Sequence, residues 1–181
     1  MSRIIAGHWK GHPLPVLHRG PVRPTSSRTR TVLFDTLPPL SQFHVLDLFS
    51  GTGSLGFEAL SRGARHLTSV DKRAGYLRQQ REWIMTHDAQ NQFDSFAMEA
   101  GKFLTKFEKE FHLILLDPPY DLELGSSFWA QLVRHLNSNS WLVYECGQRA
   151  EFEMQDDLGI TLYKSKKMGD SMLHFYTRGN A

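Results

Sequence analysis

The stretch HVLDLFSGTGSLGFEALSRGA, residues 44–64, decides the predicted fold. It opens with a short, mostly apolar run that is typical of a buried strand. A glycine-rich loop follows, and residues 54–64 have a helical pattern closed by a glycine. Gly51, Gly53 and Gly56 have the G-x-G-x-x-G spacing, which lets the backbone turn tightly and approach a nucleotide or nucleoside. The stretch therefore predicts a strand, a ligand-binding loop and a helix in succession.

The same alternation of strand and helix continues along the chain. Apolar runs predict further strands at residues 66–71, 93–98, 111–116 and 140–146. Helical patterns occur at residues 26–40, 73–87, 100–107 and 126–137. A closing hairpin is predicted from residues 159–166 and 171–178. We expect Pro38-Pro39 to end the first helix and Ser126 or Ser127 to cap the last one. Apolar strands separated by helices indicate an α/β fold with a parallel sheet covered on both faces.

Composition limits the class of protein. The chain has 181 residues, of which 40% are hydrophobic and 22% charged, as expected of a globular domain with its own core. We expect no membrane span and no signal peptide, because no apolar run is long enough. The single cysteine, Cys146, cannot form an internal disulfide, which favours a reducing, cytoplasmic location. The nine histidines form no metal-spaced cluster, so we expect no metal.

Charge is distributed unevenly along the chain. Residues 1–34 carry six basic residues and no acidic one. The other 147 residues hold the remaining 15 of the 21 basic residues and all 19 acidic ones. A basic arm on a mildly acidic body indicates an anionic partner, with nucleic acid the first candidate. A solvated tail is the alternative, although the arm also contains Trp9 and several aliphatic residues, which a tail does not need.

Ligands of such sheets bind beyond the carboxyl ends of the strands. Two aspartates near these ends distinguish between a nicotinamide dinucleotide and S-adenosylmethionine as the cofactor. Asp71 ends the second strand, 20 residues after Gly51, where a carboxylate can bind ribose hydroxyls. Asp47 lies inside the first strand, four residues before Gly51. A carboxylate there would repel the pyrophosphate of a nicotinamide dinucleotide, but it suits the α-amino group of S-adenosylmethionine, which has no phosphate.

A second motif, DPPY at residues 117–120, follows the most apolar strand. The amino group of a nucleobase is a poor nucleophile, because its lone pair is delocalised into the ring. Asp117 and the carbonyl of Pro118 offer acceptors for its two N–H groups, and the consecutive prolines hold these acceptors rigidly. Tyr120 offers a ring face on which a splayed base can stack. The motif therefore predicts chemistry on the amino group of a base.

These motifs resemble those of known enzymes. The pattern D-x-F-x-G-x-G at residues 47–53 resembles the first motif of class I methyltransferases, and DPPY resembles the [DNS]-P-P-[YF] motif of enzymes that methylate base amino groups. With RIIAGHWKGHPLPV and VRPTSSRTRTVLFDTL near the N-terminus, the whole chain resembles the RsmD family, the bacterial 16S ribosomal RNA guanine-N2 methyltransferases that act at guanine 966. Members of this family usually carry Glu where Thr31 stands and Asn where Asp35 stands.

The resemblance implies a Rossmann-like class I methyltransferase fold, with a mostly parallel seven-stranded sheet, helices on both faces and an antiparallel C-terminal hairpin. We expect residues 1–22 to form a basic N-terminal arm or hairpin, and residues 23–181 the S-adenosylmethionine-dependent methyltransferase domain. The implied substrate is the N2 amino group of a guanine in 16S rRNA, within the 30S subunit or its assembly intermediate. We expect the protein to be a monomer. Two alternatives stay open: an adenine-N6 methyltransferase acting on nucleic acid, and a non-catalytic RNA-binding or ribosome-assembly factor.

The predicted site residues fall into three groups. The predicted catalytic residues are Asp117, Pro118, Pro119 and Tyr120. The predicted cofactor-binding residues are Asp47, Phe49, Ser50, Gly51, Gly53, Asp71, Lys72, Glu99, Ala100 and Asp117, with Glu99 and Ala100 placed by the resemblance near adenine. The predicted nucleic-acid-binding residues are Arg23, Thr25, Arg28 and Arg30. Glu145, at the end of the fifth strand, either reaches the site or faces solvent.

Overall fold

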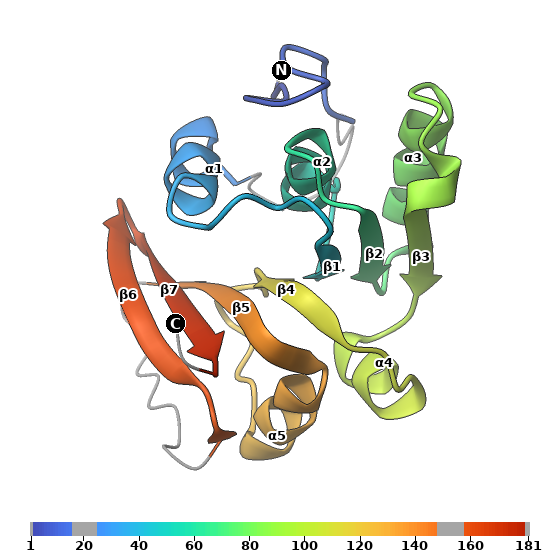
Figure 1. Cartoon of the computed structure of the whole chain (residues 1–181). Coiled ribbons are helices and arrows are strands. Elements are labelled where there is room, and N and C mark those ends of the chain that lie inside the picture. The colour runs from blue at the N-terminus through green and yellow to red at the C-terminus, as the bar shows by residue number, and fades with distance from the viewer. Residues whose placement is uncertain (1, 16–24, 148–157, 180–181) are drawn as a thin grey trace.

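The computed structural model describes residues 2–15, 25–147 and 158–179 (Figure 1). The helices are α1 (Ser27–Phe34), α2 (Ser54–Ser61), α3 (Ala74–Met85), the 3-10 helix η1 (Gln90–Gln92), α4 (Ala100–Lys106) and α5 (Ser126–Arg134). The strands are β1 (His44–Leu48), β2 (His66–Asp71), β3 (Phe93–Ala97), β4 (Phe111–Leu116), β5 (Leu136–Gly147), β6 (Thr161–Met168) and β7 (Ser171–Arg178). Every strand and helix that the sequence predicts is present, most of them with ends displaced by only a few residues.

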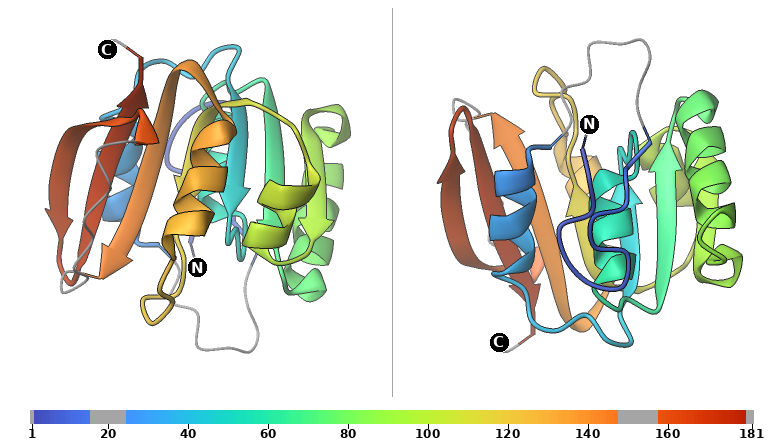
Figure 2. Two further views of the ribbon diagram at one scale, coloured as in Figure 1. Left: turned by 90° about the horizontal axis from the view of Figure 1, so that it is seen from below. Right: turned by 90° about the horizontal axis from the view of Figure 1, so that it is seen from above.

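The seven strands form one sheet in the order β3-β2-β1-β4-β5-β7-β6. Strands β1 to β5 run parallel to one another, whereas β7 runs antiparallel to both of its neighbours, β5 and β6. Helices α1, α2 and α3 lie on one face of the sheet, and α4 and α5 lie on the other (Figures 1 and 2). The predicted Rossmann-like architecture is thereby confirmed, including the C-terminal hairpin. The strand order reverses between β1 and β4, which is where such sheets open a crevice for ligands.

Helix α1 is shorter than the segment 26–40 that the sequence predicts. Ser26 caps its start, because the Ser26 hydroxyl accepts a hydrogen bond from the backbone N–H of Thr29 at 3.0 Å. The helix ends at Phe34, three residues before the position that precedes Pro38. A residue before proline disfavours the helical conformation, so the chain leaves the helix ahead of the prolines.

The boundary between α5 and β5 also differs from the prediction. Gly125 occupies the N-cap position and offers no side chain for capping, whereas Ser126 and Ser127 are already helical. The prediction that one of these serines caps the helix is therefore wrong. The helix ends at Arg134, and β5 begins at Leu136, within the segment predicted to be helical. β5 is consequently the longest strand of the described chain, with twelve residues.

The core consists of two apolar layers, one on each face of the sheet. Phe57 and Trp83 belong to the layer beneath α2 and α3, where their rings stack with centroids 4.3 Å apart. Phe103 and Trp129 belong to the layer beneath α4 and α5. Both tryptophans are buried. Burial of apolar surface contributes roughly 25 cal/mol per Å², so these layers hold the strand ends, and the loops that leave them, in fixed positions.

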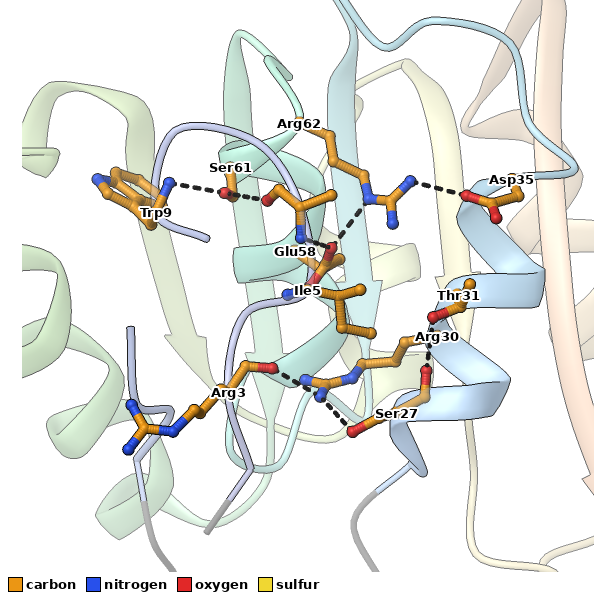
Figure 3. Close-up of polar contacts among 11 residues, drawn as sticks. Arg3, Ile5, Trp9, Ser27, Arg30, Thr31, Asp35, Glu58, Ser61 and Arg62 are labelled. Carbon is orange, nitrogen blue, oxygen red and sulfur yellow. Dashed lines mark hydrogen bonds and ion pairs between the residues drawn. The ribbon is translucent and has the colours of Figure 1, made fainter. Parts of the chain in front are cut away.

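The N-terminal segment 2–15 packs on the outer side of α2. The buried carboxylate of Glu58 accepts hydrogen bonds from the backbone N–H groups of Ile5 at 2.8 Å and Ala6 at 3.0 Å. The Ser61 hydroxyl accepts another from the N–H of Trp9 at 3.0 Å (Figure 3). Gly7 has a φ of +83°, and a Cβ at this position would lie 1.8 Å from the Ser61 carbonyl oxygen, so only glycine fits. Residues 2–15 are thus part of the folded unit rather than a solvated tail.

Two features are absent from the part of the chain that the structure describes. None of its helices has the length and apolar character needed to cross a membrane. Within the same residues, no group of three or more histidine, cysteine, aspartate or glutamate side chains is arranged to hold a metal ion. Residues 16–22 of the predicted basic arm lie outside the described residues.

Candidate active site

A cavity of about 900 Å³ lies beyond the carboxyl ends of β1, β2, β4 and β5. Its wall is completed by the start of α1, by the residues after β3 and by the turn between β6 and β7. The predicted site residues that line it are Thr25, Asp47, Phe49, Ser50, Gly51, Asp71, Lys72, Glu99, Ala100, Asp117, Pro118, Pro119 and Tyr120. The topology therefore brings both sequence motifs, which lie about 70 residues apart, to one cavity.

The glycine loop between β1 and α2 forms the floor of one half of this cavity. Gly51 and Gly53 both have positive φ, and the N–H of Gly53 donates to the carbonyl of Ser50 at 2.7 Å, which closes a tight turn. A Cβ on Gly56 would lie 2.7 Å from the methyl groups of Leu67 and 3.0 Å from a carboxylate oxygen of Asp47. Gly53 supports the turn without lining the cavity, and Gly56 lets α2 pack directly against the strands.

Asp47 is buried within β1 and faces the cavity. Its carboxylate accepts a hydrogen bond from the backbone N–H of Gly56 at 3.0 Å. Burial raises the pKa of Asp47 to about 8, the hydrogen bond from Gly56 opposes this rise, and the negative charges of Asp117 and Asp71 add to it. A cationic group placed in the cavity would favour the ionised form of Asp47 and would in turn be bound by it.

Asp71 organises the glycine loop from the end of β2. One of its carboxylate oxygens accepts from the N–H of Gly51 at 2.9 Å, and the other accepts from the N–H of Arg73 at 2.8 Å. The same loop is held from α3 by Gln80, whose side-chain N–H₂ donates to the Ser50 hydroxyl at 3.0 Å and to the Gly51 carbonyl at 2.9 Å. Gln80 was not among the predicted residues, although a polar residue within the apolar stripe of a helix is a signal that could have identified it.

Lys72, Glu99 and Ala100 lie at the rim of the same half of the cavity. The Lys72 ammonium and the Glu99 carboxylate are 3.8 Å apart, and both side chains are about two-thirds exposed. An exposed ion pair of this kind contributes little stability, so the two side chains can move apart to admit a ligand at little cost.

The second half of the cavity is built around Asp117, which directly follows β4. Leu116 is the register partner of Tyr144, so Asp117 and Glu145 leave neighbouring parallel strands side by side. The Thr25 hydroxyl donates a hydrogen bond to the Asp117 carboxylate at 2.9 Å. Burial and the neighbouring charge of Glu145 raise the pKa of Asp117 to about 7, against the lowering effect of the Thr25 hydrogen bond.

Tyr120 projects from the proline turn with its ring 55% exposed. The ring rests against Gly147, where an added Cβ would lie 3.6 Å from it. The Tyr120 hydroxyl donates to the carboxylate of Glu145 at 3.3 Å, and the Ser171 hydroxyl donates to the same oxygen at 2.9 Å. Glu145 is buried and lines the cavity, which decides between the two orientations that the sequence left open. Ser171 was not among the predicted residues, because nothing in its local sequence marks it.

The arginines predicted to contact nucleic acid differ in burial and in position relative to the cavity. Arg30 is fully buried, and its guanidinium donates to the Ser2 hydroxyl at 2.8 Å. It also donates to the Arg3 carbonyl at 2.9 Å (Figure 3). Burial lowers the pKa of Arg30, although the nearby Glu58 carboxylate opposes this. The prediction that Arg30 contacts RNA is therefore wrong, because its charge holds the N-terminal segment to α1. Arg28 is exposed on α1 outside the cavity lining, and Arg23 lies outside the described residues.

The two positions at which the chain departs from the family pattern also lie away from the cavity lining. The Thr31 hydroxyl donates to the Ser27 carbonyl within α1 at 3.0 Å. The Asp35 carboxylate pairs with Arg62 at 3.2 Å, which links the end of α1 to the end of α2 (Figure 3). Neither substitution changes the charge of the cavity wall.

Comparison with known proteins places the chain in a family. The family model described as "Conserved hypothetical protein 95" matches residues 2–177. Ribosomal RNA small subunit methyltransferase D of Escherichia coli K12 is 32% identical over 184 residues, which cover 97% of this chain and 89% of the relative. The protein of the same name from Haemophilus influenzae is 36% identical over 144 residues, which cover 77% of this chain and 72% of the relative. The chain belongs to the RsmD family.

Solved structures have the same fold as this chain. The Escherichia coli protein yhhF superposes with a TM-score of 0.87 at 27% identity, over 98% of this chain and 97% of that one. SMU.776, which was solved in complex with SAH, has a TM-score of 0.66 at 14% identity, over 83% of this chain and 48% of that one. At this low identity the second likeness shows the fold alone, which is the Rossmann-like fold of methyltransferases that the sequence predicts.

Proposed function

We propose that this protein transfers a methyl group from S-adenosylmethionine to the exocyclic N2 amino group of a guanine in 16S ribosomal RNA, within the 30S subunit or an assembly intermediate. Membership of the RsmD family supports the broader activity, an S-adenosylmethionine-dependent rRNA methyltransferase. The observation that carries the proposal is the shared cavity, in which Asp47 and the glycine loop face Asp117 and Pro118.

The first half of the cavity fits S-adenosylmethionine. This cofactor carries an α-amino cation, a sulfonium and a ribose but no phosphate, and when bound it supplies an electrophilic methyl group. Asp47 is a buried acid with a raised pKa, so a cation is the partner that its ionised form needs. The tight loop at Gly51 lets the backbone approach a ligand closely, and Glu99 lies exposed at the rim for the adenosine end. These residues bind and orient the cofactor.

The second half fits the amino group of a base. The Asp117 carboxylate and the Pro118 carbonyl are two acceptors for its two N–H groups, and they point the nitrogen lone pair away from themselves. Because Pro118 and Pro119 fix the backbone, the acceptors lose little freedom in the reaction. The exposed ring of Tyr120, held against Gly147, gives a face on which the base can stack. The adenine-N6 activity and the non-catalytic alternative share this cavity, but family membership favours rRNA methylation.

The proposal is tested by identifying the methylated nucleoside. The protein is incubated with radiolabelled S-adenosylmethionine and small ribosomal subunits from cells that lack the corresponding methyltransferase. The RNA is then digested, and its nucleosides are separated and identified by mass spectrometry. We expect label in N2-methylguanosine at one position of 16S rRNA. Label in N6-methyladenosine, or no label in any RNA while the cofactor still binds, would reject the proposal.

A further inference from the structure

Glu145 lies beside Asp117 and Pro118, the proposed acceptors of the amino group. It belongs to β5, whereas these two residues follow β4. It follows Tyr144, the last residue of β5 that pairs with β4, just as Asp117 follows the partner residue Leu116. Glu145 is buried, with 6% exposure, and it lines the cavity. Its carboxylate accepts from the Tyr120 hydroxyl at 3.3 Å and from the Ser171 hydroxyl at 2.9 Å. A carboxylate can accept about four hydrogen bonds, so these contacts orient Glu145 and are compatible with one more donor.

Two adjacent carboxylates in a methylation site require an explanation, because one suffices to orient an amino group. The charge of Glu145 raises the pKa of Asp117, so the pair costs free energy when no substrate is bound. Such an arrangement is favourable only when the ligand brings enough N–H donors to satisfy both acids. The substrate should therefore present a donor directly beside its amino group.

The Watson–Crick edges of guanine and adenine differ in this respect. In guanine, the N2 amino group is flanked by the N1–H donor. In adenine, the N6 amino group is flanked by N1, which is an acceptor. With the amino group directed to Asp117 and Pro118, a neighbouring carboxylate attracts the N1–H of guanine and repels the N1 lone pair of adenine.

We propose that Glu145 determines specificity for guanine by accepting the N1–H of the flipped base, with Ser171 and Tyr120 as the positioning residues of its carboxylate. This inference rests on the proposed function and names the residue that selects its base. Ser171 is the first residue of β7 and is buried, so β7 orients the Glu145 carboxylate through this hydroxyl. Specificity thus comes from a strand next to the DPPY motif rather than from the motif itself.

The test compares guanine with 2-aminopurine, which retains the amino group but has an acceptor at N1. Small subunits are reconstituted with 16S RNA carrying either base at the position found in the labelling experiment, and kcat/KM is measured. We expect the unaltered protein to prefer guanine by about 10-fold to 100-fold. In Glu145→Gln, the side-chain amide can donate to N1 of 2-aminopurine, so the preference should fall by about 10-fold or more. Glu123→Gln, an exposed acid outside the cavity lining, is the control and should keep the original preference.

The possible outcomes separate this inference from the function on which it rests. Equal losses on both bases in Glu145→Gln would mean a purely structural role and would overturn the inference while the proposed function stands. If the unaltered protein methylates neither base, the proposed function fails, and the inference fails with it. Thermal unfolding checks that Glu145→Gln is folded. If it is not, Ser171→Ala replaces it, and we expect about a threefold fall in preference; an unchanged preference would then overturn the inference.

Discussion

The two halves of the cavity hold their carboxylates by different means. In the cofactor half, Asp47 and Asp71 accept hydrogen bonds from backbone N–H groups that lie at most 20 residues away in the sequence. In the base half, Asp117 and Glu145 accept from side-chain hydroxyls, and the hydroxyl bound to Asp117 comes from Thr25, 92 residues away. The first half is thus a local product of one loop, whereas the second is assembled from distant elements.

This difference has a chemical consequence. A backbone donor is kept in every substitution except one to proline, so the hydrogen bonds of the cofactor half form once the loop has folded. A hydroxyl can be removed by a single substitution, so the hydrogen bonds that Asp117 and Glu145 accept can be altered one at a time. The cofactor half should therefore respond to mutation mainly through binding, and the base half mainly through the rate of transfer and the choice of base.

The largest effect is expected from Asp117→Ala, which removes an acceptor used when the amino nitrogen becomes nucleophilic. Methyl transfer should fall by about 10²-fold to 10⁴-fold, while affinity for S-adenosylmethionine changes little. Single-turnover transfer and equilibrium dialysis with labelled cofactor measure the two quantities. Glu123→Ala, nearby but exposed, is the matched control. A comparable loss of cofactor affinity would remove the distinction between the halves.

The cofactor half is tested by Asp47→Asn, which keeps the shape of the side chain and removes its charge. Affinity for S-adenosylmethionine should fall by about 10-fold to 100-fold, because the α-amino cation loses its charged partner. The rate of transfer at saturating cofactor should stay close to that of the unaltered protein. Asp88→Asn, at an exposed position beyond α3, controls for the change of net charge. A defect confined to the rate would contradict the assignment of Asp47 to cofactor binding.

A pH profile measured at saturating S-adenosylmethionine reports on the base half, because the bound cation favours the ionised form of Asp47. The pKa of Asp117 is raised to about 7 by burial and by Glu145, while Thr25 opposes the rise. Below this pH the carboxyl group is protonated and cannot accept the substrate N–H, so kcat/KM should fall about tenfold per pH unit below 7 and level off above it. Glu145→Gln removes a negative neighbour, which should move the midpoint to lower pH. Asp47 and Tyr120 also face this group, so Asp47→Asn should move the midpoint in the same direction by less. A profile that is flat from pH 6 to 8 would contradict this account.

The smallest effect is expected from Thr25→Val, which is nearly isosteric. Loss of the hydroxyl removes the hydrogen bond that lowers the pKa of Asp117. The midpoint should move to higher pH, and kcat/KM at pH 7 should fall by about threefold to tenfold. The same substitution should leave cofactor affinity unchanged. If Thr25→Val weakens RNA association but leaves the pH midpoint in place, Thr25 is an RNA contact, as the sequence predicts, rather than a partner of Asp117.

Most of the fold was predictable because its signals are local. The apolar runs at β2 and β4 have the residue ranges that the sequence predicts, and the glycine loop lies between a strand and a helix as its spacing requires. Prediction failed where tertiary contacts decide. Arg30 looks like any other arginine of a basic arm, and only its burial against Ser2 and Arg3 shows that it binds the protein itself. Ser171 likewise reaches the site only through the pairing of β7 with β5.

The reversed direction of β7 places a hairpin turn in the wall of the cavity. The parallel strands that border the cavity do so with their carboxyl ends, whereas β7 contributes its first residue, Ser171. The turn residues Gly169 and Asp170 line the cavity next to it. A longer turn between the paired residues Met168 and Ser171 would reshape the opening of the cavity without removing a strand pair. A change in the turn of the C-terminal hairpin could therefore alter which RNA the site accepts while the cofactor half stays unchanged.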